Sequence, residues 1–314
     1  MTAPVFEAAG VTKTFGSVTA LDRVDLACLG GEVHAVLGEN GAGKSTLMHV
    51  ASGLIDPDGG ELRLCGERVV WRSADEAHAA GIAMVHQHFM LVPTMTVSEN
   101  LALAEGALGV LDRAVLDQRV QELARTRGLD IGDPARTVEQ LSVGEQQRVE
   151  ILKALVDVPA LLILDEPTAV LTPSEVVDLF AMLRELAAKG TAIAIVTHKL
   201  AEVFAIADRV TVLRHGSRVV TGMASEFDRD SLARSMVGEG TPAATAPDRA
   251  EAWGDVLLEV RSLVRMSGAR RALDRVDLSV QGGEVVVVAG VEGNGQQELQ
   301  EAIAGLQALS LIHI

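Results

Sequence analysis

The composition of this 314-residue chain excludes several classes of protein. Its 27 Lys and Arg against 43 Asp and Glu give a formal net charge of −16, which repels nucleic-acid backbones. The sequence has neither about 18 consecutive apolar residues nor a basic and then apolar N-terminus, so we expect no membrane span and no secretory signal. Cys28 and Cys65 lie far apart and predict neither a disulfide framework nor a zinc site. The length favours two domains, or one large domain with an appendage, in a reducing compartment.

Short apolar segments alternate with longer amphipathic ones, a pattern typical of an α/β fold. The helical segments between 97 and 157 follow one another without an intervening strand, so we expect a helical subdomain inserted into a sheet domain. Pro173 suits the first turn of the helix that follows it. The predicted strands are 32–37, 82–86, 161–164, 193–197 and 209–213, and the predicted helices are 45–51, 97–104, 111–127, 144–157 and 174–188.

A glycine-rich loop, GENGAGKST at 38–46, lies between a predicted strand and a predicted helix. In this context glycines turn backbone N–H groups inward onto phosphate oxygens, and the helix dipole favours the anion. We expect Lys44 to reach the β- and γ-phosphates and Ser45 to hold Mg²⁺, so the loop predicts ATP and Mg²⁺ as cofactors. The alternative, an ordinary turn with Lys44 in solvent, is disfavoured because strand, loop and helix are all in place. The residues expected to contact the nucleotide are Gly38, Asn40, Gly41, Gly43, Lys44, Ser45 and Thr46.

Two carboxylates end the apolar segment LLILDEP at 161–167. The carboxyl ends of parallel strands are where α/β folds collect ligands, so we expect Asp165 and Glu166 at that edge of the sheet. Asp165 suits Mg²⁺, usually through water, and Glu166 is placed to orient or deprotonate an attacking water as a general base. An ordinary helix-capping pair is the alternative, and a phosphate-binding loop upstream makes it the weaker interpretation.

The segment LSVGEQQ at 141–147 lies between these two motifs and opens a predicted helix. Here the chain resembles the ATPase subunits of ABC transporters, in which an LSGGQ-like segment of one nucleotide domain closes over ATP held on the loop of another. Ser142 and Gly144 match that segment, whereas Val143 and Glu145 depart from its commonest form. Backbone N–H groups at the start of a helix suit a γ-phosphate. The resemblance implies a P-loop NTPase sheet domain with an inserted helical subdomain.

The resemblance also assigns roles to residues outside these motifs. It implies that Gln87 contacts Mg²⁺ and the attacking water, that His198 contacts the γ-phosphate, and that Phe15 stacks on adenine. The alternatives are satisfied polar residues at Gln87 and His198, and core packing at Phe15. The family's aspartate after the second carboxylate is absent, because Thr172 stands in its place. We therefore expect communication between paired sites to differ in this chain.

The chain contains an incomplete internal repeat with an offset of 252 residues. ALDRVDL occurs at 20–26 and again at 272–278, and GVEGNGQQE at 290–298 aligns with the glycine-rich loop. Gln296 replaces Lys44 there, so the second loop lacks the cation and is expected to be a weak nucleotide site at best. We expect an ABC ATP-binding domain at 1–238, a linker at 239–255, the start of a degenerate second copy at 256–306, and a tail at 307–314 that is non-native or, alternatively, a natural apolar end.

Two further segments resemble importers of nucleosides and simple sugars: PTAVLTP at 167–173 and HQHFMLVPTMTVSEN at 86–100. The resemblance implies an ATP-hydrolysing subunit, peripheral at the cytoplasmic face of the membrane. It would couple ATP turnover to uptake through separate permease subunits, with an extracellular solute-binding protein as an indirect partner. The apolar run 89–93 is expected either to dock the permease or to fill the junction between subdomains.

A complete ATP site of this family needs a second signature segment, and the repeat ends before one occurs. We therefore expect this chain to hydrolyse ATP poorly unless two copies assemble head to tail. The alternatives are a truncated remnant that binds ATP with little turnover, and a soluble ABC ATPase acting on ribosomes or DNA. The last is disfavoured because 238–255 holds one Arg and four acidic residues, where an arm for nucleic acid would be basic. We expect no nucleic-acid partner.

Overall fold

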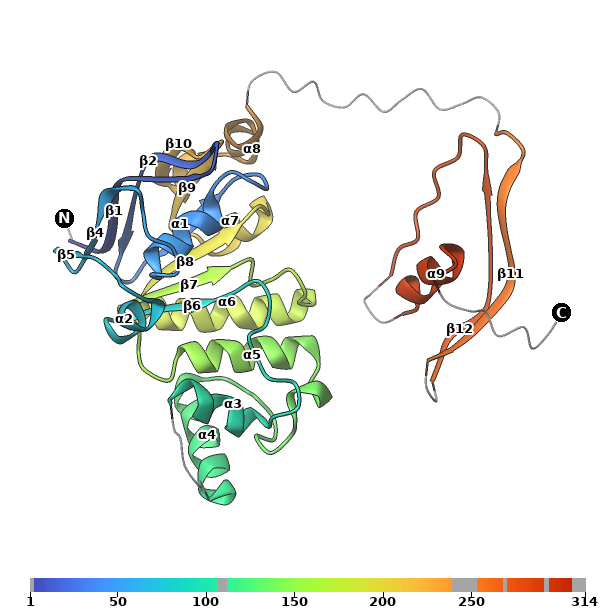
Figure 1. The fold of residues 1–314 in the computed structure, drawn as a ribbon, viewed down its shortest axis with the longest axis horizontal. Coiled ribbons are helices and arrows are strands. Elements are labelled where there is room, and N and C mark those ends of the chain that lie inside the picture. Colours follow the sequence, from blue (N-terminus) through green and yellow to red (C-terminus); the bar gives the residue numbers. More distant parts are fainter. Residues whose placement is uncertain (1–2, 107–111, 239–252, 268–269, 291–293, 307–314) are drawn as a thin grey trace. The chain divides into compact units, whose positions relative to one another are not determined.

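The computed structural model describes residues 3–106, 112–238, 253–267, 270–290 and 294–306. The chain divides into two compact units, Met1–Thr241 and Pro242–Ile314 (Figure 1). Most of the expected linker and all of the expected tail lie outside the described residues. Within the described part of the chain, no helix is long and apolar enough to cross a membrane.

The first unit is built around a six-stranded sheet in the order β10-β9-β3-β8-β7-β6. Every neighbouring pair from β9 to β6 is parallel, and β10 adds an antiparallel edge. All five strands predicted from the sequence are confirmed, and their central residues, except the half-buried Met84, are buried, as expected for parallel strands covered on both faces. The strands are β3 (Val33–Leu37), β6 (Ile82–Val85), β7 (Leu161–Asp165), β8 (Ala192–Thr197), β9 (Arg209–Arg214) and β10 (Ser217–Met223).

A second sheet of the first unit is antiparallel, in the order β2-β1-β4-β5. It was not predicted, because its strands mix buried residues with half-exposed ones and form no continuous apolar run. An antiparallel sheet tolerates this pattern, since one of its faces can remain exposed to solvent. Its strands are β1 (Pro4–Phe15), β2 (Val18–Leu29), β4 (Gly59–Leu64) and β5 (Glu67–Val69).

The five predicted helices are confirmed, with ends that move by up to three residues. The helix predicted at 144–157 starts at Val143 and already ends at Ala154. In the described part of the first unit, three short helices were not predicted: α2 (Ala74–Ala79), α7 (Leu200–Ile206) and α8 (Arg229–Val237). The predicted ones are α1 (Lys44–Ala51), α3 (Val97–Ala104), α4 (Arg113–Arg127), α5 (Val143–Ala154) and α6 (Pro173–Ala188).

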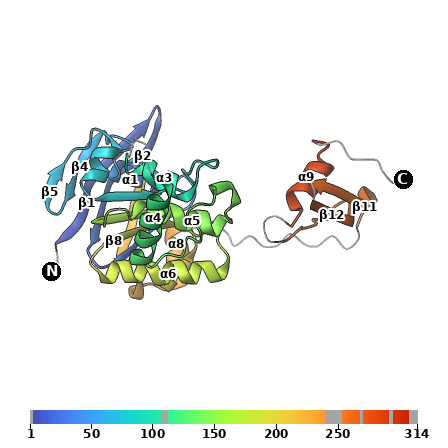
Figure 2. The same ribbon diagram turned by 90° about the horizontal axis from the view of Figure 1, so that it is seen from below.

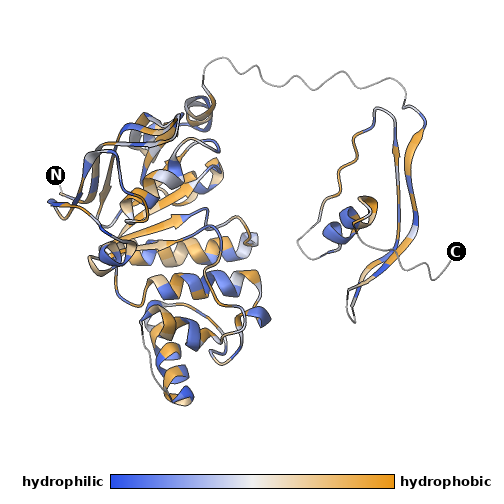
Figure 3. Cartoon of the chain, viewed as in Figure 1, coloured by the Kyte–Doolittle hydropathy of each residue, from blue (hydrophilic) through white to orange (hydrophobic). Residues whose placement is uncertain are grey.

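Among the described residues, three hydrophobic cores flank the parallel sheet, and β7 contributes to two of them on opposite faces. Leu162 and Leu164 of β7 pack into the core that contains residues of α3 to α6, while Leu161 and Ile163 pack into the core shared with α1 and the antiparallel sheet. This alternation is the period of two that a strand imposes. Figure 3 shows the central strands as predominantly apolar ribbons, and Figure 2 shows α3, α4 and α5 from below. The sheet thereby holds the loops at its strand ends in defined positions.

The described part of the second unit consists of an antiparallel pair, β11 (Val256–Ser267) and β12 (Arg270–Gln281), and the helix α9 (Gln296–Ile303). By the internal repeat, residues 285–288 correspond to the first four residues of β3, but they form no strand. Val285 is 87% exposed and Val287 81%, whereas Val33 in β3 is 0% exposed.

Candidate functional site

The glycine-rich loop joins β3 to α1, as predicted. Gly43 caps α1 with a φ of +101°, a left-handed conformation that other residues rarely adopt. A Cβ at Gly43 would lie 2.5 Å from the carbonyl oxygen of Ala20, and a Cβ at Gly38 would lie 2.4 Å from that of Leu213. Both positions therefore require glycine, because the neighbouring backbone leaves no room for a side chain.

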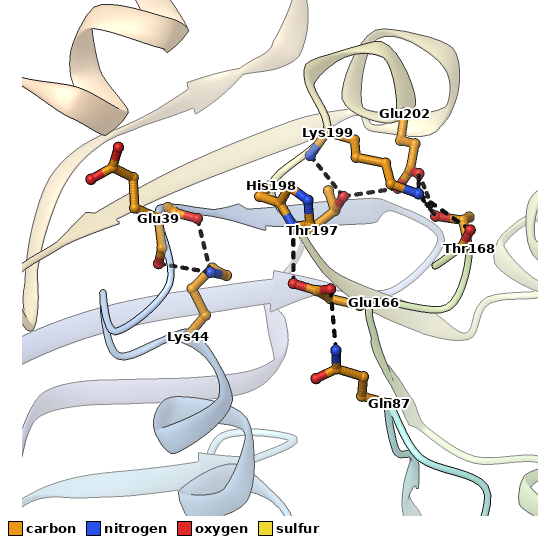
Figure 4. Close-up of polar contacts among 10 residues, drawn as sticks. Glu39, Lys44, Gln87, Glu166, Thr168, Thr197, His198, Lys199 and Glu202 are labelled. Atoms are coloured by element: carbon orange, nitrogen blue, oxygen red, sulfur yellow. Dashed lines mark hydrogen bonds and ion pairs between the residues drawn. The ribbon is translucent and has the colours of Figure 1, made fainter. Parts of the chain in front are cut away.

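Lys44, the first residue of α1, is 6% exposed and folds back over the loop. Its Nζ donates hydrogen bonds to the carbonyl oxygens of Gly38 at 2.8 Å and Glu39 at 3.0 Å (Figure 4). Burial lowers the pKa of Lys44, and the nearby carboxylates of Glu166 and Asp165 oppose this shift. A buried ammonium of this kind suits an anionic ligand, whose charge replaces the lost hydration better than carbonyl dipoles do.

Three polar side chains meet where neighbouring parallel strands end. Glu166 follows β7, and its Oε1 accepts a hydrogen bond from Nδ1 of His198, which follows β8, at 3.0 Å. Glu166 Oε2 accepts from Nε2 of Gln87, which lies just after β6, at 3.4 Å (Figure 4). Glu166 has a φ of +48°, an uncommon value for a residue with a side chain and one found preferentially at functional sites. The structure thus brings together the three predicted catalytic residues.

These side chains and the glycine-rich loop line one open cleft of about 300 Å³. Asp165, the last residue of β7, is 5% exposed and does not line the cleft. Its Oδ1 is buried and has no hydrogen-bond partner among the described residues, which marks a place for a cation or a donor. The lining residues are Asn40, Gly41, Gly43, Lys44, Ser45, Thr46, Gln87, Glu166 and His198.

The predicted signature segment lies at the start of α5 and does not line this cleft. Ser142 Oγ accepts from the Glu145 backbone N–H at 3.2 Å, and Glu145 Oε2 accepts from the Ser142 N–H at 2.7 Å. Arg136 donates to Glu145 at 2.8 Å. Burial raises the pKa of Glu145, but the hydrogen bonds from Ser142 and Arg136 lower it overall. A Cβ at Gly144 would lie 1.7 Å from Glu175 Oε1, so a larger residue there would displace the Glu175 side chain, and Glu145 stabilises the start of the helix.

Phe15 and the apolar run 89–93 reach the surface to different degrees. Phe15 is 49% exposed, with Lys13 Nζ 5.7 Å from its ring centroid, so the core-packing alternative is wrong. Met90 is 64% exposed, whereas Leu91 is 9% exposed and belongs to the core shared by α3 to α6. Leu91 therefore fills the junction, as one of the two expectations had it, whereas docking of the permease by the exposed Met90 stays a prediction.

Four polar residues beside the cleft were not predicted: Thr168, Thr197, Lys199 and Glu202. They form a connected group of hydrogen bonds and one ion pair (Figure 4). Thr168 and Glu202 are 34 residues apart, so no local spacing could have paired them. The only signal was that Lys199 is one of five lysines in the chain.

The helix start of the second glycine-rich loop repeats the backbone conformation of the first. Gly295 caps α9 with a φ of +100°, against +101° for Gly43 before α1. The residue that follows is Gln296 in place of Lys44. The duplicated helix start therefore keeps its conformation although a neutral amide has replaced the cation.

Comparison with known proteins shows where this arrangement recurs. Residues 21–169 match the family described as ABC transporter. The chain is 45% identical to a glucose import ATP-binding protein of Haloferax volcanii over 98% of its length and 61% of the relative. It is 44% identical to a nucleoside import ATP-binding protein of Lactococcus lactis subsp. cremoris and 46% identical to a ribose import ATP-binding protein of Rubrobacter xylanophilus, each over 96% of the chain and 60% of the relative. The chain thus spans about 60% of the length of these curated relatives.

Solved structures show the same fold. A nucleotide-free ATP-binding cassette from an ABC transporter superposes with a TM-score of 0.67 at 26% identity, covering 75% of this chain and all of that one. A dimeric ATP-binding cassette in a post-hydrolysis state, bound to ADP and Pi, gives 0.61 at 27% identity, covering 70% of this chain and 98% of that one. The predicted α/β fold is confirmed. Taken with the sequence motifs, these similarities establish that residues 21–169 of the chain belong to the ABC transporter family.

Proposed function

We propose that this chain is the ATP-binding and ATP-hydrolysing subunit of an ABC importer for a nucleoside or a simple sugar. One observation carries the proposal: a single cleft joins the phosphate-binding loop to Gln87, Glu166 and His198 from three other strand ends. The relatives are named for glucose, nucleoside and ribose import at 44–46% identity, so their names support both solute classes equally.

Phosphate binding follows from the loop and Lys44. The Nζ of Lys44 now donates to the carbonyl oxygens of Gly38 and Glu39, and it can exchange them for β- and γ-phosphate oxygens without leaving its place. The charge-assisted hydrogen bonds formed in this way are shorter and stronger than bonds to neutral carbonyls. Thr46 lines the same cleft and is placed to contact a phosphate.

Mg²⁺ fits the residues present. Asp165 Oδ1 is a buried carboxylate oxygen without a partner among the described residues, and the Ser45 hydroxyl and the Gln87 amide line the cleft. Carboxylate, hydroxyl and amide oxygens are ligands that a hard cation prefers, so Ser45, Gln87 and Asp165 would hold the ion. When bound, it would supply positive charge against the phosphates.

Hydrolysis requires a base for the attacking water, and Glu166 is placed for this role. His198 and Gln87 each donate to one of its oxygens, which fixes the direction of the carboxylate toward the cleft. A positioned carboxylate that removes a proton in the transition state contributes about 10²- to 10⁴-fold to the rate. His198 follows the neighbouring strand and lines the same cleft, and we expect it to contact the γ-phosphate as well.

Several parts of the proposal concern the whole protein. Ser142, Val143, Gly144 and Glu145 at the start of α5 would close over nucleotide on a second domain or on a head-to-tail copy. The exposed Met90 suits contact with a permease subunit at the cytoplasmic face of the membrane, because exposed apolar side chains mark contact surfaces. Support for both comes from the family and from the names of the relatives.

Paired substitutions test the chemistry. Lys44→Ala is expected to weaken ATP binding at least about tenfold, because it removes charge-assisted hydrogen bonds. Glu166→Gln is expected to keep ATP binding within about twofold while turnover falls at least about 100-fold. Binding is measured with a fluorescent ATP analogue and turnover by phosphate release. The exposed Glu185→Gln on α6 is the matched control and should behave as the wild type. Full turnover in Glu166→Gln would contradict the assignment of the base.

Assembly and transport need separate tests. If the composite site forms between two copies, the specific ATPase rate should rise with protein concentration, and a full rate independent of concentration would contradict head-to-tail pairing. ATP binding without turnover at any concentration would favour the truncated-remnant alternative. Neighbouring genes for two permeases and a solute-binding lipoprotein would support import, and the ligand of that lipoprotein would separate nucleosides from sugars.

A further inference from the structure

A buried carboxylate on α7 connects the two loops that carry Glu166 and His198. Thr168 lies two residues after Glu166, and Thr197 directly precedes His198. Glu202 Oε1 accepts a hydrogen bond from Thr168 Oγ1, and Glu202 Oε2 accepts one from Thr197 Oγ1 at 2.8 Å (Figure 4). Thr168 and Thr197 are each 3% exposed, and Glu202 is 7% exposed. One oxygen of the carboxylate therefore serves the loop after β7, and the other serves Thr197, the last residue of β8 before the loop of His198.

Lys199 supplies the positive charge for this carboxylate. Its Nζ lies 3.1 Å from Glu202 Oε1, and it donates to the carbonyl oxygen and to Oγ1 of Thr168 at 3.2 and 3.1 Å. The backbone N–H of Lys199 donates to Thr197 Oγ1 at 3.0 Å. The Glu202 cluster, defined as Thr168, Thr197, Lys199 and Glu202, is thus a neutral, connected hydrogen-bond network. Removing one member of such a network leaves a buried polar group unpaired.

The backbone alone does not hold the two loops together over their whole length. The regular pairing of β7 with β8 ends at Asp165 and Val196, followed by a hydrogen bond from the Glu166 N–H to the Val196 carbonyl oxygen at 3.0 Å. Past that bond, among the described residues, side chains join the two loops: His198 contacts Glu166, Lys199 donates to the Thr168 carbonyl oxygen, and Glu202 of α7 bridges Thr168 and Thr197. The Glu202 cluster lies at this point.

We propose that Glu202 is a positioning residue that ties the loop after β7 to the loop after β8 and so sets the 3.0 Å contact between His198 Nδ1 and Glu166 Oε1. The catalytic meaning of this contact rests on the proposed function, whereas the tie itself is a property of the fold. Glu202 makes no hydrogen bond to Glu166 or His198 among the described residues. It acts through Thr168, two residues after Glu166, and through Thr197, directly before His198.

The test of the tie is amide hydrogen exchange on the full chain. Glu202→Gln keeps the size of the side chain but replaces one acceptor oxygen with an NH₂ group, which cannot accept from a threonine. Exchange should become about tenfold faster both in 166–171 and in 197–200, because the link between them is broken: one threonine loses its acceptor, and the Lys199 ammonium, which also holds Thr168, loses its counter-charge. Glu185→Gln should exchange as the wild type. Unchanged exchange, or a change in one loop only, would overturn the proposal.

A double-mutant cycle shows whether the threonines act through Glu202. Thr168→Val should speed exchange in its own loop, 166–171, and Thr197→Val in 197–200. When either is combined with Glu202→Gln, exchange should be no more than about twofold faster than in Glu202→Gln alone, because the contact is already lost. Additive effects would show independent roles and would overturn the tie.

Turnover tests the catalytic consequence. In Glu202→Gln, kcat should fall about tenfold while KM and the Kd for ATP stay within about twofold, because binding depends on the phosphate loop and turnover on the Glu166–His198 geometry. Unchanged kcat with faster exchange would overturn the positioning role. A wild-type chain without turnover would instead contradict the proposed function, and the exchange data would still decide on the Glu202 cluster.

Discussion

His34 in β3 is a buried histidine whose neighbours select one tautomer. Nδ1 lies 3.1 Å from the carbonyl oxygen of Ala27, which can only accept, so Nδ1 carries the proton. Nε2 then accepts from Thr211 Oγ1 at 2.8 Å, and Thr211 in turn accepts from Thr221 Oγ1 at 2.8 Å. Burial and the nearby Arg209 guanidinium lower the pKa of His34 to about 4. The neutral ring is therefore part of the fold.

Acid should destabilise the first unit through His34. The ordinary pKa of 6.5 applies when the chain is unfolded and a value of about 4 when it is folded, so the stabilisation is complete above pH 6.5 and is lost as the pH falls toward 4. Between pH 7 and 5 this group should account for about 2 kcal/mol of lost unfolding free energy. Urea denaturation of wild type and His34→Gln measures the difference, and the exposed His78→Gln is the control. Equal pH dependence in wild type and His34→Gln would contradict this assignment.

At the scale of elements, the start of α6 shows what replaces the family's aspartate. Thr172 is the N-cap: its Oγ1 accepts from the Glu175 N–H at 3.4 Å, and Glu175 Oε2 accepts from the Thr172 N–H at 2.9 Å. Pro173 occupies the first helical position, as predicted. Thr and Asp both cap helices through a side-chain oxygen, so the helix start survives the exchange of one for the other.

The two substitutions of Thr172 separate capping from other roles. Thr172→Ala should lower the free energy of unfolding by about 1 kcal/mol, because the backbone N–H groups of the first turn lose their acceptor. Thr172→Asp should stay within about 0.5 kcal/mol of the wild type, because the cap is kept. Both changes in unfolding free energy are measured from the midpoints of urea denaturation curves, and the denaturant dependence (m-value) should stay unchanged. If Thr172→Asp lowers the free energy of unfolding as much as Thr172→Ala does, then helix capping does not explain the threonine at this position.

At the scale of the whole molecule, the internal repeat places one sequence pattern in two environments. Val33 begins the central strand β3, which pairs with both β8 and β9. Val285, 252 residues later, belongs to a segment that forms no strand in the described part of the second unit. The same residue type is 0% exposed in one position and 87% in the other.

A matched pair of substitutions tests this difference. Val33→Thr should cost about 1–3 kcal/mol of unfolding free energy, because it buries a hydroxyl among apolar neighbours at constant size. Val285→Thr should stay within about 0.5 kcal/mol, as exposed substitutions do. Chemical denaturation followed by circular dichroism gives both values. An equal loss at the two positions would mean that Val285 is covered in solution, for example by a second copy of the chain, which sedimentation would detect.

The sequence by itself determined the phosphate-binding loop, the strand that ends in Asp165 and Glu166, and the repeat, because their chemistry needs fixed residue types at short fixed spacings. The tertiary structure decided what depends on distant neighbours: the antiparallel sheet, the exposure of Phe15, and the hydrogen bond between Glu202 and Thr168, which are 34 residues apart. It also decided which copy of the repeated segment forms a strand. A parallel strand forms only where neighbours supply its hydrogen bonds, and β8 and β9 supply them to Val33, while the described residues offer none to Val285.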